Sequence, residues 1–80
     1  MDIHPSARRH GVLDEDITYA FAHQAVSVFL GDEPDRWLVI GPSRAANLLE
    51  LVVLITAEGD ELVIHAMRMR PKYERFLSDD

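Results

Sequence analysis

The sequence predicts an α+β domain in which two N-terminal helices pack on a four-stranded antiparallel sheet, with a short C-terminal helix after the sheet. Changes in the hydrophobic period predict this order. Apolar residues follow helical spacing between residues 14 and 24, whereas residues 25 to 67 contain alternating patterns and short apolar runs. Turn residues separate four of these runs, and strands joined by short turns usually pair with their neighbours.

The first helix is predicted over the segment from His4 to Gly11. Pro5 suits the first turn of a helix, and Arg8 and Arg9 lie near the last turn, where cations interact favourably with the helix dipole. Gly11 is suited to the left-handed conformation that often ends a helix.

The second helix is predicted from Asp14 to about Gln24. Asp14 is a suitable capping residue, and Glu15 and Asp16 favour the positive end of the helix. Apolar residues then recur at helical spacing: Ile17, Ala20 and Phe21. These two helices are expected to cover the apolar face of the sheet, leaving the opposite face partly open.

The strands are predicted at residues 25–30, 36–40, 48–56 and 61–67. The connections between them contain glycine, proline, asparagine or acidic residues, which are typical of turns. Pro71 is expected to end the sheet, because proline lacks the backbone N–H that a strand needs. Residues 72–77 are predicted to form the terminal helix.

Length and composition indicate one domain spanning residues 1–80. The chain has no cysteine, which excludes disulfides and thiolate metal sites, and its start has no apolar segment typical of a signal peptide. The longest apolar run, Leu48 to Ala57, is interrupted by Glu50 and is too short to cross a membrane. We therefore expect a cytoplasmic protein without a membrane partner.

Positive charge is concentrated near the C-terminal end of an acidic chain. The net charge is −6, and residues 1–64 contain eleven acidic residues against four basic ones. Half of the eight basic residues lie between Leu62 and Leu77: Arg68, Arg70, Lys72 and Arg75. This basic segment suits RNA phosphates or an acidic segment of a protein partner, although a solvated strand end beside a helix is an equally good interpretation.

Regular alternation along the last strand predicts that Arg68 and Arg70 point to the same side of the sheet. Two guanidinium groups with a common direction can hold a phosphate and stabilise the negative charge that develops during transesterification. Lys72 would add a cation at the rim. The alternative is that the two arginines are exposed strand ends that pair with Glu50 or Asp80.

Cleavage of RNA without a metal requires groups that transfer protons, and the basic segment contains three candidate types: His65, Lys72 and Tyr73. His65 is the best of these, because an unperturbed imidazole titrates near pH ~6.5. Alternation places it across the sheet from Arg68, and a histidine between apolar neighbours is more often a hydrogen-bonded core residue.

Metal and cofactor motifs are absent from the sequence. The four histidines lie far apart and lack the close pairing typical of zinc ligands, so we predict neither a metal nor a cofactor. Glu50 interrupts an apolar strand and must either face the open side of the sheet or pair with a cation. We expect it to pair with an arginine of the neighbouring strand.

Several segments together resemble the BrnT toxins, small bacterial ribonucleases of type II toxin–antitoxin systems with a RelE-like fold. The resemblance covers nearly the whole chain and rests on short, common residue types. It is carried by Arg9-His10-Gly11-Val12, the acidic start at 14–16, Val26-Ser27-Val28, the Trp37-Leu38-Val39-Ile40-Gly41 strand, the apolar strand after it and the final strand that ends in basic residues. Where that family has Ser-Ala-Arg at the end of its last strand, this chain has His65-Ala66-Met67 followed by Arg68.

The resemblance implies a metal-independent endoribonuclease that cuts RNA, inhibits translation and is neutralised by a cognate antitoxin. Catalysis would then fall to Arg68, Arg70, Lys72 and His65, and RNA binding to His10, Tyr73 and Arg75. Both a toxin–antitoxin hetero-oligomer and a homo-oligomer are compatible with so small a domain.

A second interpretation is a non-catalytic protein-interaction module on the same scaffold. The shifted arginine and the net charge of −6 favour it. The sequence leaves both interpretations open, because fold analogy alone does not establish function.

Overall fold

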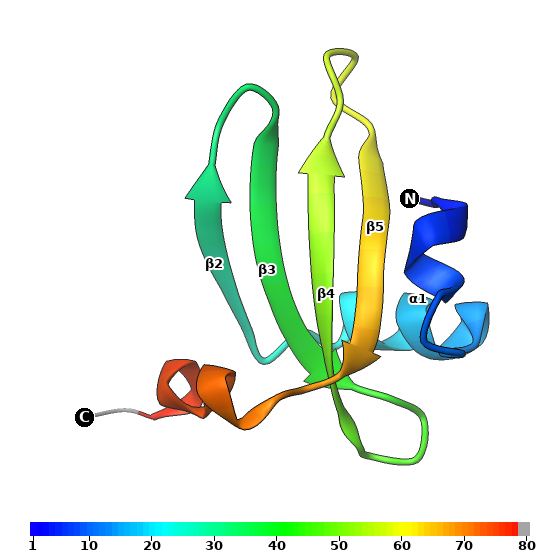
Figure 1. Cartoon of the computed structure of the whole chain (residues 1–80), viewed down its shortest axis with the longest axis vertical. Coiled ribbons are helices and arrows are strands. Elements are labelled where there is room, and N and C mark those ends of the chain that lie inside the picture. Colours follow the sequence, from blue (N-terminus) through cyan, green and yellow to red (C-terminus); the bar gives the residue numbers. More distant parts are fainter. Residues whose placement is uncertain (79–80) are drawn as a thin grey trace.

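A five-stranded mixed sheet forms the centre of the computed structural model, which describes residues 1–78 (Figure 1). The elements are, in chain order, β1 (Asp2–Ile3), the 3-10 helix η1 (Pro5–Arg8), α1 (Asp14–Ala22), β2 (Val26–Gly31), β3 (Asp35–Pro42), β4 (Leu48–Ile55), β5 (Glu61–Arg68) and the 3-10 helix η2 (Pro71–Leu77). The four predicted strands therefore exist, with ends that differ by one or two residues.

The predicted four-stranded antiparallel sheet is wrong, because a fifth strand makes the sheet mixed. The strand order is β1-β5-β4-β3-β2, and β1 pairs with β5 in parallel. Asp2 lies beside Leu62 and Ile3 beside Val63, and the backbone N–H of His4 continues the pairing by donating to the Val63 carbonyl at 2.8 Å. A strand of two residues is too short to produce a hydrophobic period, so the sequence carried no signal for it.

The prediction of two N-terminal helices is also wrong. Residues Pro5–Arg8 form a single 3-10 helix, and the first α-helix is α1 at residues 14–22. Pairing in β1 holds the chain up to His4 in an extended conformation, while Gly11 turns it at a φ of 76°. Too few residues remain between these points for a stable α-helix. The C-terminal helix likewise has 3-10 geometry, over residues 71–77.

Helix α1 begins at Asp14 with Leu13 as its capping residue, so Asp14 is not the side-chain cap that the sequence predicts. Its first turn contains three acidic residues at the positive end of the helix. Two of them form ion pairs: Asp14 with Arg8 and Asp16 with Arg44, each at 2.9 Å. These contacts attach the start of α1 to η1 and to the loop that follows β3.

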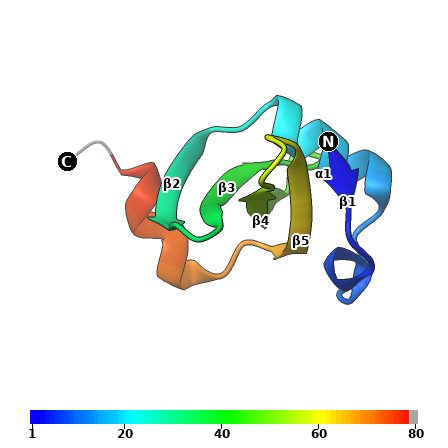
Figure 2. The same cartoon turned by 90° about the horizontal axis from the view of Figure 1, so that it is seen from above.

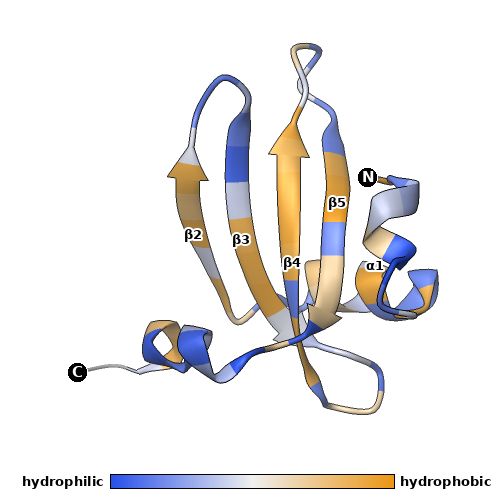
Figure 3. Cartoon of the chain, in the orientation of Figure 1, coloured by the Kyte–Doolittle hydropathy of each residue, from blue (hydrophilic) through white to orange (hydrophobic). Residues whose placement is uncertain are grey.

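The hydrophobic core lies between α1, η1 and one face of the sheet. Its buried members are Ala7, Ile17, Ala20, Val39, Leu49, Leu51, Val53, Val63 and Ala66. β4 is apolar along most of its length and occupies the middle of the sheet (Figure 3). The segment that contains η2 lies on the opposite side of the sheet from α1 (Figure 2). Leu38 and Ile40, which alternate with the core residues of β3, are also buried.

A β-bulge interrupts the alternation of side chains in β5. Val52 pairs with His65 and Val53 pairs with Val63, so Ile64 has no opposite residue in β4. The hydroxyl of Ser6 donates a hydrogen bond to the Ile64 carbonyl at 2.6 Å, which fixes η1 against this bulge. The bulge changes which residues share a face: Val63 and Ala66 both point into the core, whereas Leu62 pairs with Leu54 on the other face.

No helix within residues 1–78 has both the length and the apolar composition needed to cross a bilayer.

The backbones of α1 and the sheet approach each other closely at Gly41 in β3. A Cβ atom at this position would lie 2.3 Å from the Ala20 carbonyl oxygen and 3.2 Å from the Cα atom of Gln24. Both obstacles are backbone atoms, so rotation of a side chain cannot relieve them. Glycine is therefore required here by packing.

We predict that Gly41→Ala lowers the free energy of unfolding by about 1–3 kcal/mol, because the added methyl group pushes the end of α1 away from β3. Chemical denaturation measures this change. The matched control is Gly59→Asn, at a turn position with open space and a φ of 89°, because asparagine tolerates positive φ better than most residues. Equal stability of Gly41→Ala and the wild type would contradict the close packing described here.

Candidate active site around Glu50

A buried carboxylate marks the candidate site. Glu50 lies in β4 between Leu49 and Leu51, and its side chain is only 1% exposed. Alternation along β4 points Leu49 and Leu51 into the core beneath α1, so Glu50 points to the opposite face of the sheet. An ionised carboxylate in such a place needs cationic and hydrogen-bonding partners.

Arg70 supplies most of those partners. Its Nη2 atom lies 2.6 Å from Glu50 Oε1, its Nε atom lies 3.1 Å and 3.2 Å from the two carboxylate oxygens, and its backbone N–H donates to Oε2 at 2.9 Å. Glu50 thus pairs with an arginine, as expected, but Arg70 lies two residues beyond the end of the neighbouring strand β5 and not within it. The Arg70 side chain remains 43% exposed, so the guanidinium joins the buried carboxylate to the protein surface.

His65 is the third group on this carboxylate. Its Nε2 atom lies 2.9 Å from Glu50 Oε1, and its side chain is 27% exposed. The β4–β5 register places His65 opposite Val52, two strand positions from the Glu50–Met67 pair, so His65 lies on the same face as Glu50. A carboxylate that holds one ring nitrogen fixes the orientation of the imidazole and leaves the other nitrogen for a ligand.

A second histidine lies next to His65. The ring centres of His10 and His65 are 5.6 Å apart, with the rings nearly perpendicular. His10 follows η1, whose buried Ala7 and bonded Ser6 attach it to the edge of β5. Two imidazoles from opposite ends of the sequence therefore share one surface site.

Burial raises the pKa of the Glu50 carboxyl, but hydrogen bonds from the Arg70 side chain, the Arg70 backbone and His65 outweigh this effect. The pKa of Glu50 consequently lies below its usual range. The same carboxylate raises the pKa of Arg70. Glu50 is therefore an anion in the folded protein, and its charge is directed at His65 and Arg70.

Arg68 points to the other side of the sheet, so the prediction that it shares a direction with Arg70 is wrong. It pairs with Leu49, whose side chain is in the core beneath α1, and its Nη2 atom donates to Asn47 Oδ1 at 3.1 Å. Arg70 lies beyond the end of β5, where regular alternation no longer applies. The proposed two-arginine phosphate clamp is not formed by this pair. Asp80, the alternative partner for these arginines, lies outside the described residues.

The remaining predicted residues lie in η2. The Tyr73 ring has Arg70 Cζ at 5.6 Å and Lys72 Nζ at 5.1 Å from its centre, so Lys72 and Tyr73 adjoin the Arg70 end of the site. Arg75 instead lies over Phe76, with Cζ 4.7 Å from the ring centre. Within residues 1–78, Lys72 and Arg75 make neither a hydrogen bond nor an ion pair.

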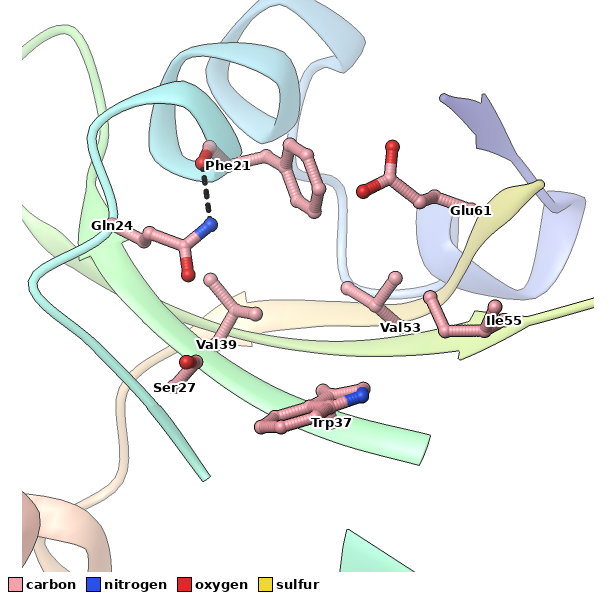
Figure 4. Close-up of a pocket in the computed structure, with 8 residues that line it drawn as sticks. All are labelled: Phe21, Gln24, Ser27, Trp37, Val39, Val53, Ile55 and Glu61. Carbon is pink, nitrogen blue, oxygen red and sulfur yellow. Dashed lines mark hydrogen bonds between the residues drawn. The ribbon is translucent and has the colours of Figure 1, made fainter. Parts of the chain in front are cut away.

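Apart from the cluster around Glu50, the structure has a mostly apolar hollow of about 210 Å³ on the α1 side of the sheet (Figure 4). Phe21 of α1 and Trp37 of β3 lie on either side of Val39 and Val53, and Gln24 donates a hydrogen bond to the Phe21 carbonyl at 3.0 Å. Its lining includes a single titratable residue, Glu61. This hollow therefore lacks the pairs of titratable side chains that acid–base chemistry needs, whereas the cluster around Glu50 contains them.

In the part of the chain that the structure describes, no three or more histidine and acidic side chains are grouped so as to hold a metal ion. Comparison of the chain with protein-family models, with curated proteins and with solved structures found no match. The likeness to the BrnT toxins therefore stays a prediction, and the geometry around Glu50 has to be interpreted by its chemistry.

The depressed pKa of Glu50 predicts a loss of stability in acid. An unfolded glutamate titrates near pH ~4.3, so below this value the unfolded chain binds a proton more readily than folded Glu50 does. The free energy of unfolding should therefore fall as the pH is lowered from about 5 through the folded-state pKa, and it should fall less steeply in Glu50→Gln.

Denaturant titrations at a series of pH values measure this slope. Asp14 and Asp16 also have lowered pKa values, because of hydrogen bonds from Arg8 and Arg44, so Glu50→Gln keeps part of the acid dependence. Glu58→Gln, in the exposed turn before β5, is the matched control and should follow the wild type. Identical acid profiles of Glu50→Gln and the wild type would refute the role given to this carboxylate.

Proposed function

We propose that the chain is a metal-independent endoribonuclease in which His10 and His65 transfer protons. One observation carries the proposal: a buried carboxylate holds His65 at 2.9 Å while a second imidazole lies 5.6 Å from its ring, beside exposed cations. Two imidazoles can act as base and acid near neutral pH without a metal.

In the proposed reaction, one imidazole removes the proton from a ribose 2′-hydroxyl, and the resulting oxygen attacks the adjacent phosphorus. The bond from phosphorus to the 5′-oxygen of the next nucleotide breaks, and the other imidazolium donates a proton to that oxygen. The products are a 2′,3′-cyclic phosphate and a 5′-hydroxyl, so no water or cofactor is consumed. Glu50 is a positioning residue, because it is too buried to contact RNA.

Arg70 and Lys72 are the groups that would stabilise negative charge on the phosphorane. Arg70 directs Nε and Nη2 to Glu50, so Nη1 is the nitrogen that would contact a phosphate oxygen, beside the Tyr73 side chain that also interacts with this guanidinium. The ammonium of Lys72 lies 5.1 Å from the centre of the Tyr73 ring and has neither a hydrogen bond nor an ion pair within residues 1–78. Charge stabilisation of this kind is commonly among the largest contributions to catalysis. Tyr73 would stack on a base, and Arg75 would extend the contact to the RNA backbone.

The biological setting that we propose is a toxin–antitoxin system, on the strength of the resemblance to BrnT toxins. In this setting the protein acts in the cytoplasm, inhibits translation by cutting RNA and is neutralised by a cognate antitoxin. The basic segment is the natural surface for an inhibitor with acidic residues, because it is the most positive part of a chain with a net charge of −6.

A non-catalytic interaction module is the second candidate function. β2 is an edge strand of the sheet, and two of its large apolar side chains are exposed: Phe29 by 50% and Leu30 by 46%. An uncovered edge strand with apolar side chains is a common protein-interaction surface. This function needs neither histidine, which separates the two candidates experimentally.

Substitution of either histidine should slow cleavage of RNA by about 10²-fold or more, the usual contribution of a general acid or base. The assay compares wild type, His10→Ala and His65→Ala on a labelled oligoribonucleotide in the presence of a chelator, across pH 5 to 9. His23→Ala is the matched control, because His23 lies at the end of α1 and stacks on Tyr19. Cleavage by the two site variants at the wild-type rate would refute the proposed mechanism.

Inducible expression in a bacterial host tests the toxin function. We expect arrest of growth with loss of intact RNA for the wild type, and relief of both in an Arg68→Ala/Arg70→Ala double variant at equal protein level. Arg8→Ala/Arg36→Ala is a control that removes the same charge from residues outside the candidate site. Normal growth with intact RNA on wild-type expression would instead favour the interaction module.

A further inference from the structure

An open groove adjoins the histidine pair on the α1 side of the sheet. Its volume is about 370 Å³, within the range usual for small-ligand sites. The groove is bounded by the His10–Leu13 segment, the start of α1, the loop after β3 and the end of β5. Leu49 and Val12 contribute apolar surface, and His10 lies in the lining.

One wall of the groove presents hydrogen-bond donors. Arg68 of β5 lines it and is held in place by the bond from its Nη2 atom to Asn47 Oδ1 at 3.1 Å. The other nitrogens of Arg68 have no partner within residues 1–78, and the amide NH₂ of Asn47 is also unused there. A guanidinium whose orientation is fixed can donate two parallel hydrogen bonds to a pair of acceptors.

The groove also has a fixed acceptor from another element. Asp16 of α1 receives both of its hydrogen bonds from Arg44 on Oδ1, from the backbone N–H at 3.0 Å and from Nε at 2.9 Å. Its Oδ2 atom has no hydrogen-bond partner in the described part of the chain. Arg44 thus orients a carboxylate in the groove lining without using its second oxygen.

We propose that this groove is a guanine-binding subsite of the ribonuclease, an inference that rests on the proposed function. Guanine presents two acceptors, O6 and N7, which match a bidentate arginine such as Arg68. Its N1–H and N2–H₂ groups are donors that match the free oxygen of Asp16. Adenine has an acceptor at N1 and no O6, so it would place a lone pair toward the carboxylate and lose a bond from Arg68.

The groove and the catalytic groups meet at His10, which lines the groove and lies 5.6 Å from His65. A guanine held by Arg68 and Asp16 therefore has its ribose and phosphate beside the histidine pair. The cleaved bond is accordingly the one adjacent to a guanosine. This arrangement gives Arg68 a function in base recognition, separate from the phosphate contact of Arg70.

Binding of nucleotides tests the subsite without relying on cleavage. Titrations of the full chain with 3′-GMP, 3′-AMP, 3′-CMP and 3′-UMP, followed by calorimetry or amide NMR shifts, should show 3′-GMP binding at least about tenfold more tightly than the others. The largest amide shifts should lie in residues 10–16 and 43–49. Equal affinity for all four nucleotides, or no binding of 3′-GMP at millimolar concentration, would overturn the inference.

Two variants test whether Asp16 and Arg68 are responsible for the preference for 3′-GMP. Asp16→Asn keeps an oxygen for Arg44 but loses the carboxylate, and Arg68→Gln loses the bidentate donor; each should reduce the preference for 3′-GMP over 3′-AMP to about threefold or less. Arg8→Ala removes the comparable Arg8–Asp14 ion pair, and neither of these residues lines the groove, so this variant should retain the preference. Loss of preference in Arg8→Ala but not in Asp16→Asn would overturn the assignment.

Cleavage assays separate this inference from the proposed function. Oligoribonucleotides with a single G, A, C or U in a constant context should be cut next to G. Cleavage without base preference would overturn the guanine subsite and leave the ribonuclease standing. Selective binding of 3′-GMP without cleavage of any RNA would confirm the subsite and overturn the ribonuclease.

Discussion

The buried charge of Glu50 is the constraint on which the rest of the candidate site depends. A carboxylate with a 1% exposed side chain is costly unless cations and N–H groups surround it. Its partners are His65 in β5 and Arg70 just beyond that strand. The hydrogen bonds of this one carboxylate therefore stabilise both the β4–β5 register and the path of the chain toward η2. Satisfying this charge brings an imidazole and a guanidinium to the surface in fixed positions.

The far edge of the sheet completes the arrangement. β1 pairs with β5 in parallel, and Ser6 of η1 donates a hydrogen bond to the bulge in β5. The segment after η1, which contains His10, therefore lies at the sheet edge next to His65. His10 thereby joins two environments: the polar cluster of Glu50 on one face and the groove of Arg68 and Asp16 on the other. Because sheet edges are accessible from both faces, His10 is placed to link the proposed proton-transfer pair to the proposed base-binding groove.

The strands β2 to β5 and the pairing of Glu50 with an arginine could be predicted from the sequence, whereas the fifth strand β1 and the grouping of site residues could not. Period-two alternation located the long strands, and a lone acid in an apolar run indicated a cationic partner, because both are local signals. β1 and the proximity of His10 to His65 depend on contacts across more than fifty residues, for which a single sequence has no local signal. The expected common direction of Arg68 and Arg70 failed because β5 ends at Arg68, so the rule that relates alternate side chains did not reach Arg70.

The long sequence separation between His10 and the group formed by His65 and Arg70 also bears on protein synthesis. During translation, the early histidine leaves the ribosome well before the late residues that orient its neighbour. A nascent chain that has not yet exposed β5 lacks a partner for Glu50 and has no second imidazole beside His10. The topology therefore delays assembly of the histidine pair until β5 is released, so under the proposed function a growing chain would be unable to cut the messenger that encodes it.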